Sequence, residues 1–304
     1  MTAKIVVVGS FNADLTSYME RMPRPGETVH GRRFVVGPGG NGSNQAVAAA
    51  RLGAAVTFVR RIGQDVFAPF ALNLWQQEGI NTAYVVQDPE HATGVAPIFV
   101  DDSGENSIVV VLGANLAVSK ADVDAAVEAI AGADVLLTQL EIDYETVGHA
   151  LRVAREHGVR TILNPAPAGH LPPAVIALAD YLTPNETELE ILSGRPGASI
   201  EEAAQSLLTT DEQTIVMTLG AQGARYLRRD GTALIPSFKV EVVDTTGAGD
   251  AFNAGLAVAL AEGRSLPDAI AFANATAALC VTKPGTAPSM PRRAEVEALL
   301  ASRS

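Results

Sequence analysis

The stretch VVDTTGAGDAF, residues 242–252, is the segment that decides how the chain is interpreted. In it, Gly247 and Gly249 flank Ala248, and a long apolar run over 251–260 follows. The apolar run predicts a helix, so the glycines form the turn at its start. The first amides of a helix have no intrahelical partner, and glycines leave them uncovered. The turn therefore predicts a site for an anion, most often a phosphate.

Asp250 follows this turn directly and needs a separate explanation. A carboxylate repels a bound anion, but beside an anion site it can accept the proton of an attacking hydroxyl. The alternative is an acid in the first helical turn that serves capping and the helix dipole. Neither a Gly-Lys-Ser/Thr sequence nor a G-x-G-x-x-G spacing occurs here, which excludes a Walker loop and a dinucleotide fingerprint. We interpret the stretch as machinery for phosphoryl transfer to an alcohol.

Composition narrows the classes of partner. The chain has 304 residues, a net charge of −12 and a single cysteine, Cys280. An acidic chain without a basic patch disfavours nucleic acid as a partner, although local amides can still bind a small anion. One cysteine forms no internal disulfide, which fits the cytoplasm. No apolar run is long enough for a signal segment or a membrane span, so we expect no membrane partner.

Strand and helix patterns alternate along most of the chain. Strands are expected at 5–8, 56–62, 83–88, 95–101, 107–112, 134–138, 160–163, 181–183 and 214–218, with an extended segment at 240–243. Helices are expected at 42–52, 65–78, 119–131, 144–157, 186–193, 200–208, 248–262, 266–280 and 292–300. This predicts one α/β domain over 1–304, with a mostly parallel sheet covered by helices on both faces. Regions 14–36 and 93–112 are expected to add a small β-sheet lid.

Several motifs resemble those of one enzyme family. DTTGAGDAF closely resembles the C-terminal signature of the ribokinase-like family of sugar and nucleoside kinases, and GGNGSNQA at 39–46 resembles its N-terminal signature. GSFNAD, NPAPA, TPNETE, TLGAQG and KPGTAPSMP, which begin at residues 9, 164, 183, 218 and 283, match further motifs in the expected order. The matches cover nearly the whole chain and are most similar to the ribokinase branch.

The resemblance assigns a set of residues to the sugar. These are Asn12, Asp14, Gly39, Gly40, Asn41, Asn44 and Glu141. Asn12 and Asp14 lie just past the first strand, at the sheet edge where α/β proteins bind ligands, although an Asx turn would use the same residues. Ribokinases usually carry Lys where this chain has Asn41, which is shorter and neutral. That departure leaves the identity of the sugar open.

The resemblance also implies sites for ATP, Mg²⁺ and K⁺. The nucleotide is expected near Asn185, Thr218, Gly220, Gly223, Gly249 and Asn274, with Glu188 holding Mg²⁺ through water. By spacing alone, Asn185 and Glu188 form a helix capping box. The expected K⁺ ligands are oxygens of Asp244 and Thr246, together with the backbone carbonyls of Cys280, Lys283 and Gly285 and the Ser289 hydroxyl.

The reaction that follows is ATP-dependent phosphorylation of D-ribose at its 5-hydroxyl. In it, Asp250 accepts the hydroxyl proton, and the amides of Gly247, Ala248 and Gly249 stabilise the phosphoryl group. Deoxyribose, another pentose or hexose, or a nucleoside remains an alternative substrate. A sugar-binding regulator without turnover is a third hypothesis, which the intact Asp250 disfavours. A homodimer formed through the β lid is also expected.

Overall fold

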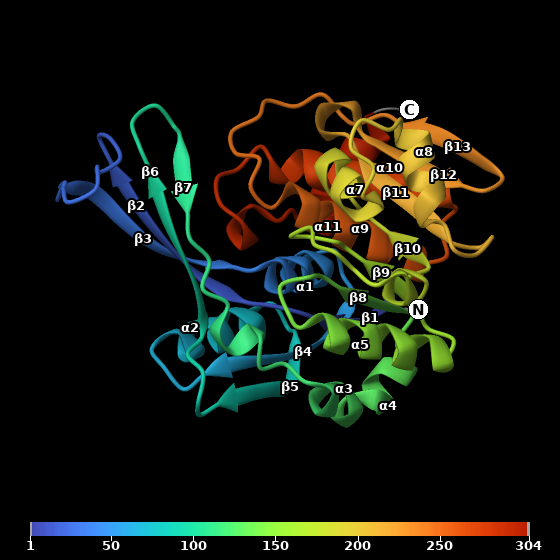
Figure 1. Ribbon diagram of the computed structural model, residues 1–304, viewed down its shortest axis with the longest axis horizontal. Helices are drawn as coiled ribbons and strands as arrows, with labels where there is room; N and C mark the ends of the chain where they lie inside the picture. Colours follow the sequence, from blue (N-terminus) through green and yellow to red (C-terminus); the bar gives the residue numbers. More distant parts are fainter. Residues whose placement is uncertain (1, 303–304) are drawn as a thin grey trace.

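The computed structural model describes residues 2–302, which form a nine-stranded sheet and a separate four-stranded sheet (Figure 1). The order of the large sheet is β13-β12-β11-β10-β9-β8-β1-β4-β5, and it is parallel from β5 to β11. Its strands are β1 (Lys4–Val8), β4 (Ala55–Gly63), β5 (Asn81–Asp88), β8 (Val135–Thr138), β9 (Arg160–Leu163), β10 (Tyr181–Leu182), β11 (Thr214–Thr218), β12 (Ala224–Arg228) and β13 (Gly231–Ile235).

Strand β1 shows why the sheet is covered on both faces. Ile5 and Val7 belong to one hydrophobic core, whereas Val6 and Val8 belong to the other. Successive side chains of a strand point to opposite faces, so a continuous β-branched run feeds both cores. The predicted parallel sheet with helices on both faces is confirmed.

Each core is closed by its own set of helices. One face packs against α1 (Asn41–Arg51), α2 (Phe67–Gln77), α9 (Ala248–Ala261), α10 (Leu266–Cys280) and α11 (Arg293–Ala301). The other face packs against α3 (Lys120–Ala125), α4 (Val127–Ala131), α5 (Tyr144–Glu156), α6 (Pro173–Ile176), α7 (Glu186–Ser193) and α8 (Ile200–Leu207). Short 3-10 turns lie at η1 (Gly113–Asn115), η2 (Gly220–Gln222) and η3 (Ala287–Ser289). Within residues 2–302, no helix has the length and apolarity needed to cross a bilayer.

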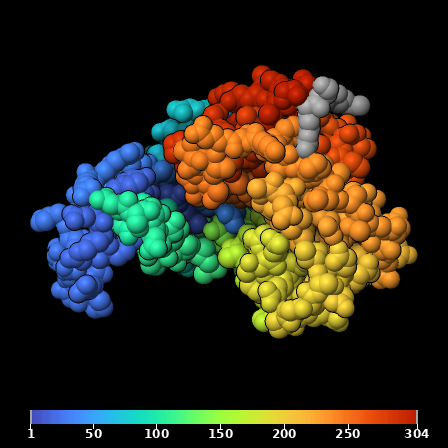
Figure 2. Space-filling model, turned by 90° about the horizontal axis from the view of Figure 1, so that it is seen from above, coloured from blue at the N-terminus to red at the C-terminus, as the bar shows by residue number. Residues whose placement is uncertain are grey.

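The four-stranded sheet has the order β3-β2-β6-β7 and projects from one side of the main body (Figure 1). It consists of β2 (Asn12–Met19), β3 (Gly31–Gly39), β6 (Gly94–Val100) and β7 (Asn106–Ile108). These strands come from the two regions in which the sequence predicted a small sheet. From above, the sheet stands beside the C-terminal half of the chain, with a hollow between them (Figure 2).

Some sequence predictions were wrong in detail. Residues 240–243 form no strand, and Val242 and Val243 are each 59% exposed. The helix expected over 119–131 is broken at Ala126, whose ψ of 7° leaves the α-helical range. The antiparallel hairpin of β12 and β13 was not predicted, because its half-buried strands mix charged, polar and apolar residues with little contrast between their faces.

Candidate active site

Asp250 lies in the first turn of α9, at the edge of the sheet where the parallel strands end. Its side chain is 6% exposed. The Nδ2 atom of Asn44 and the Nε2 atom of Gln45 each donate a hydrogen bond of 2.9 Å to its carboxylate. Both donors belong to α1, so the first turns of two helices meet at this acid.

Two glycines begin these helices in conformations that other residues avoid. Gly247, the N-cap of α9, has φ of 80°, and Gly40, the N-cap of α1, has φ of 85°. A Cβ atom on Gly40 would lie 2.6 Å from the Cα atom of Phe11. Glycine is therefore required for the left-handed turn at both positions and for close backbone packing at Gly40.

Burial raises the pKa of Asp250 to about 7. The amide donors of Asn44 and Gln45 lower this pKa, whereas the nearby charges of Glu141 and Asp14 raise it further. The pKa of Asp14 is also raised to about 7, first by burial and then by the charge of Glu141. Two acids with pKa values near neutrality at one site are typical of a catalytic centre.

Glu141 organises the side of the site where the sugar residues were predicted. It accepts hydrogen bonds from the Oγ atom of Ser10, from the Nδ2 atom of Asn12 at 3.3 Å and from the backbone amide of Asn41 at 2.8 Å. Asn115 donates to the Oδ1 atom of Asn12 at 2.9 Å. The Asn12 side chain is therefore held at both ends, which fixes its orientation.

A cavity of about 180 Å³ opens in front of Asp250. Its lining is polar and contains Asn41, Asn164, Ala166, Thr183, Asn185, Glu188, Thr218, Thr245, Gly247, Ala248, Gly249, Asp250 and Asn253. The Asn41 side chain donates to the carbonyl oxygen of Ala166 at 3.3 Å, so it lies across this cavity. Asn41 occupies the position where we expected ribokinases to carry a lysine.

A second cavity, of about 610 Å³, adjoins the first and has mostly apolar walls. Both are lined by Thr218, Thr245, Ala248 and Gly249. Gly220, Gly223 and Asn274 line the larger one, where the sequence placed the nucleotide. The Nδ2 atom of Asn274 donates to the carbonyl of Ile235 at 2.9 Å, so this amide group supports the cavity wall. Val240 and Val242 also line this space, so the 240–243 segment contributes to the cavity wall and forms no strand.

Asn185 and Glu188 form the capping box expected from their spacing, with both reciprocal hydrogen bonds at 2.8 Å. Glu188 also lines the smaller cavity, and burial raises the pKa of its carboxyl group. Across residues 2–302, no three His, Cys, Asp or Glu side chains gather as metal ligands. Few carboxylates face this cavity, and Glu188 suits Mg²⁺ that keeps its waters and binds phosphate oxygens.

The residues expected to bind K⁺ come from two segments that the fold brings together. Asp244 accepts hydrogen bonds from the backbone amide of Thr246 and from that of Gly285, each at 2.9 Å. The Sγ atom of Cys280 lies 3.0 Å from the Oγ atom of Ser289 and 3.9 Å from the carbonyl oxygen of Thr246. A carboxylate, a hydroxyl and backbone carbonyls are the hard oxygen ligands that suit such a cation.

Lys283, the remaining residue of this predicted set, turns its side chain away. Its Nζ atom binds the Oε1 atom of Glu295 at 2.7 Å. Only its backbone is left to contribute, as the prediction required. The ion pair removes a positive charge that would otherwise repel a cation at the adjacent turn.

Sequence reasoning missed the residues that support the site from behind. Ser10, Gln45, Asn115, Gln139 and Arg60 are buried and hydrogen-bonded into it. Gln45 lies within the GGNGSNQA motif, so the motif itself was the sequence feature that could have identified Gln45 as a site residue.

Arg60 carries no comparable sequence signal. Its guanidinium group lies over the rings of Phe11, Phe58 and Trp75 and donates to Asn115 at 3.2 Å. Burial lowers its pKa well below the usual range, while Glu141 raises it. An arginine within a strand pattern is ordinarily exposed, so only the tertiary structure could place it here.

Comparison with known proteins identifies the class: the pfkB family carbohydrate kinase model matches residues 2–293, so the chain belongs to this family and is a phosphotransferase with an alcohol acceptor. It is 45% identical to ribokinase of Bacillus subtilis, over 97% of this chain and 99% of the relative. It is 41% identical to deoxyribokinase of Salmonella typhi, over 94% and 95% respectively. The structure of Arabidopsis thaliana ribokinase complexed with ribose and ATP matches with a TM-score of 0.90 and 34% identity, over 99% of each chain.

Replacement of Gln45 tests the electrostatics of the site. Gln45→Leu removes a donor to the ionised carboxylate, so the pKa of Asp250 rises above its value of about 7. A ¹³C carboxyl titration by NMR measures this shift. Gln139→Leu is the control, because Gln139 contacts Gln45 and not Asp250, and its effect is smaller. An unchanged or lowered pKa of Asp250 in Gln45→Leu would show that the Gln45 hydrogen bond does not stabilise the ionised carboxylate.

Proposed function

We propose that this protein transfers the γ-phosphoryl group of ATP to the 5-hydroxyl of D-ribose, giving ribose 5-phosphate and ADP. The observation that carries this proposal is the position of the α9 turn between two adjoining cavities. Gly249 lines both of them, and Asp250 faces the smaller one. A sugar hydroxyl at Asp250 and the phosphates of a nucleotide that extends from the larger apolar cavity into the small polar one would therefore meet at the start of α9.

The chemistry follows from the groups at that meeting point. Asp250 accepts the proton of the sugar hydroxyl, and the resulting oxygen attacks the γ-phosphorus as the bond to ADP breaks. A pKa raised to about 7 keeps the carboxylate available near neutral pH while it remains basic enough to take a proton. The first amides of α9, at Gly247, Ala248 and Gly249, supply donors for the charge on the transferring group.

In the same proposal, the polar network orients the sugar. Asn12, Asp14 and Glu141 supply acceptors and an amide for the ring hydroxyls, which such groups bind well. Gly39 and Gly40 let the backbone approach the sugar, and Asn44 contributes from α1. Asp14 has its pKa raised to about 7 by burial, so a sugar hydroxyl that donates to it would stabilise its ionised form.

We also propose the two metal roles. Glu188 would hold Mg²⁺ through water at the smaller cavity, where the ion neutralises phosphate charge. Asp244 and Ser289, with carbonyls of Thr246, Cys280, Lys283 and Gly285, would hold K⁺ beside the 247–250 turn. The contacts between these two segments, from the Gly285 amide to Asp244 and from the Cys280 thiol to the Thr246 carbonyl, support the K⁺ proposal, because an ion shared by the segments would order the turn. Cys280 is free and buried, which suits a reducing cytoplasm.

Deoxyribose is the second candidate sugar, for two reasons. Relatives with both names match this chain at similar identity. In addition, Asn41 is shorter and neutral where a lysine was expected, which changes the hydrogen bonding available to one hydroxyl. The central chemistry at Asp250 would be the same for both sugars.

A substrate panel tests the function directly. D-Ribose, 2-deoxyribose, other pentoses, hexoses and nucleosides are each incubated with ATP and Mg²⁺ while ADP release is measured, in K⁺ and again in Na⁺. We expect the highest kcat/KM for D-ribose and faster turnover in K⁺. A preference for 2-deoxyribose establishes the alternative, and an equal rate in both salts contradicts the K⁺ site. If no sugar causes ADP release, the result favours the alternative of a sugar-binding protein without turnover.

Replacement of the proposed base tests its role. Asp250→Asn lowers kcat by at least about 10²-fold, with little change in sugar affinity, because an amide accepts no proton. Asp268→Asn is the matched control: Asp268 also lies in the first turn of a helix, α10, and its carboxylate accepts a hydrogen bond from the hydroxyl of the N-cap residue Ser265. Steady-state kinetics and direct sugar titration measure the two effects. Near-normal turnover of Asp250→Asn would contradict the role of Asp250 as the general base.

We propose that the four-stranded sheet is a lid over the proposed sugar site and also pairs with a second copy of the chain. Strand β2 begins with Asn12 and strand β3 ends with Gly39, and both residues belong to the proposed sugar site. Large apolar side chains are exposed on it and on the segment that follows, among them Phe34 at 61% and Ile108 at 52%. Monomers rarely expose such a surface without a partner.

Sedimentation velocity tests the dimer. The parent chain sediments as a dimer, and the double variant Phe34→Ser, Ile108→Ser shifts toward the monomer because it loses apolar burial. Val66→Ser is the control, since Val66 is 81% exposed and lies outside the small sheet. A parent chain that stays monomeric at every concentration, or a double variant that dimerises equally well, refutes the proposal.

A further inference from the structure

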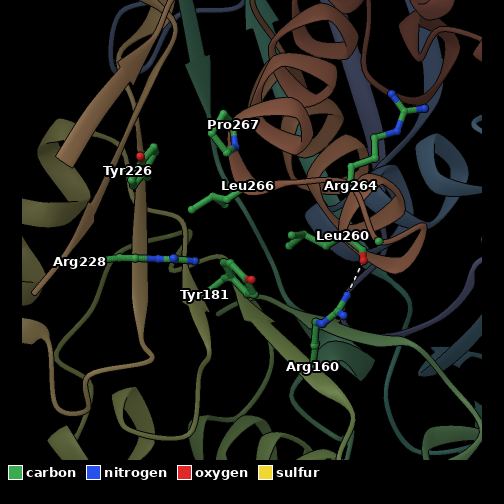
Figure 3. A pocket seen from close by; sticks show the side chains of 9 residues that line it. Arg160, Tyr181, Tyr226, Arg228, Leu260, Arg264, Leu266 and Pro267 are labelled. Atoms are coloured by element: carbon green, nitrogen blue, oxygen red, sulfur yellow. Dashed lines mark hydrogen bonds between the residues drawn. The ribbon is translucent and has the colours of Figure 1, made fainter. Parts of the chain in front are cut away.

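A cavity of about 350 Å³, whose lining Figure 3 shows, lies near the C-terminal end of α9, whereas Asp250 lies in the first turn of this helix. Arg160 and Tyr181, which begin β9 and β10, line it at the amino ends of these parallel strands. Leu260 from the end of α9 and Leu266 from the start of α10 complete one wall. Because α9 begins at the catalytic turn, its whole length separates this cavity from the proposed chemistry.

Two arginines, Arg160 and Arg228, line this cavity, and within residues 2–302 each makes one side-chain hydrogen bond. Arg160 donates to the carbonyl oxygen of Leu260, and the Nε atom of Arg228 donates to the Oγ1 atom of Thr214 at 2.8 Å. Neither has a carboxylate within 4.0 Å among the residues that the structure describes. A guanidinium carries five N–H donors, so one neutral hydrogen bond fixes each group and leaves the others available.

The third arginine of the lining has a different role. Arg264 pairs with Glu262 and Glu297, and its guanidinium lies 4.4 Å from the ring centre of Phe272. Figure 3 shows it pointing away from Arg160 and Arg228. No Asp or Glu lines the cavity within the described chain. In a chain with a net charge of −12, two unneutralised cations at one cavity form a local site for an anion.

The remaining lining is suited to an organic group. Tyr181 and Tyr226 present aromatic rings, and Leu260 and Leu266 add aliphatic surface. Figure 3 shows Arg228 extending toward Tyr181, so a positive group and an aromatic ring adjoin each other. The volume lies at the lower end of the range for small-molecule sites.

We propose that this cavity is a second ligand site, which binds a small organic anion: a phosphate or carboxylate attached to a planar apolar body. The anionic group lies between Arg160 and Arg228. A guanidinium group can donate two parallel hydrogen bonds to either a phosphate or a carboxylate. The apolar body lies against the tyrosines and leucines. The site is separate from the phosphoryl-transfer site and does not depend on the identity of the sugar.

Binding of phenyl phosphate tests this site by isothermal titration calorimetry, with ribose and a non-hydrolysable ATP analogue present in saturating amounts to fill the other cavities. We expect one further site, weakened at least about tenfold by Arg160→Gln and by Arg228→Gln, because each loses a charged hydrogen-bond donor. Benzoate and inorganic phosphate are titrated in parallel. They show which anionic group is preferred and whether the apolar body contributes.

Arg152→Gln is the matched control, because Arg152 is an exposed arginine on α5 that does not line the cavity. It should bind phenyl phosphate as the parent does, and circular dichroism with unchanged kcat confirms that all variants are folded. Arg160→Lys and Arg228→Lys keep the charge and should retain part of the affinity. Equal binding by the parent and both Gln variants, equal weakening by all three Gln variants, or no binding at about 10 mM probe overturns the proposal.

Discussion

The contact between the first turns of α1 and α9 is the constraint on which the site depends. Asp250 receives hydrogen bonds from Asn44 and Gln45, and it is almost completely buried. Two helix N-termini meet at this acid, and the positive ends of their dipoles compensate part of its charge. Without that arrangement, an ionised carboxylate at 6% exposure would be strongly unfavourable.

This contact also explains how one sheet edge serves two ligands. The α9 turn forms the boundary between the small polar cavity and the larger apolar cavity. Helix α1 carries Asn41 and Asn44, two residues of the predicted sugar site. Burial raises the pKa values of Asp14 and Asp250, and the charge of Glu141, which lies in the same region, raises both further. Such mutual destabilisation is costly for folding and useful for a base, and it is concentrated where the chain is proposed to act.

Polar groups that contact no substrate in the proposal still determine the geometry. Asn115 holds Asn12, Gln139 holds Gln45, and Arg60 packs among three aromatic rings behind them. All three are buried, and the polar atoms of two of them are only partly satisfied: Nε and Nη1 of Arg60 and Oε1 of Gln139 have no hydrogen-bond partner among the described residues. The hydrogen bonds that are made hold the side chains of Asn12 and Gln45 in one orientation, which favours orientation of a sugar.

The sequence by itself determined the class of fold and the core of the site. Continuous β-branched runs such as 5–8 require burial on both faces, and the glycines before Asp250 leave helix amides uncovered. These are local effects, and local sequence carries them. Tertiary structure alone decided that 240–243 leaves the sheet to line a cavity, that Arg60 is buried, and that Gln45 reaches Asp250 across 205 positions. These features depend on packing between segments far apart in the chain, and no local pattern specifies which distant partner a side chain will meet.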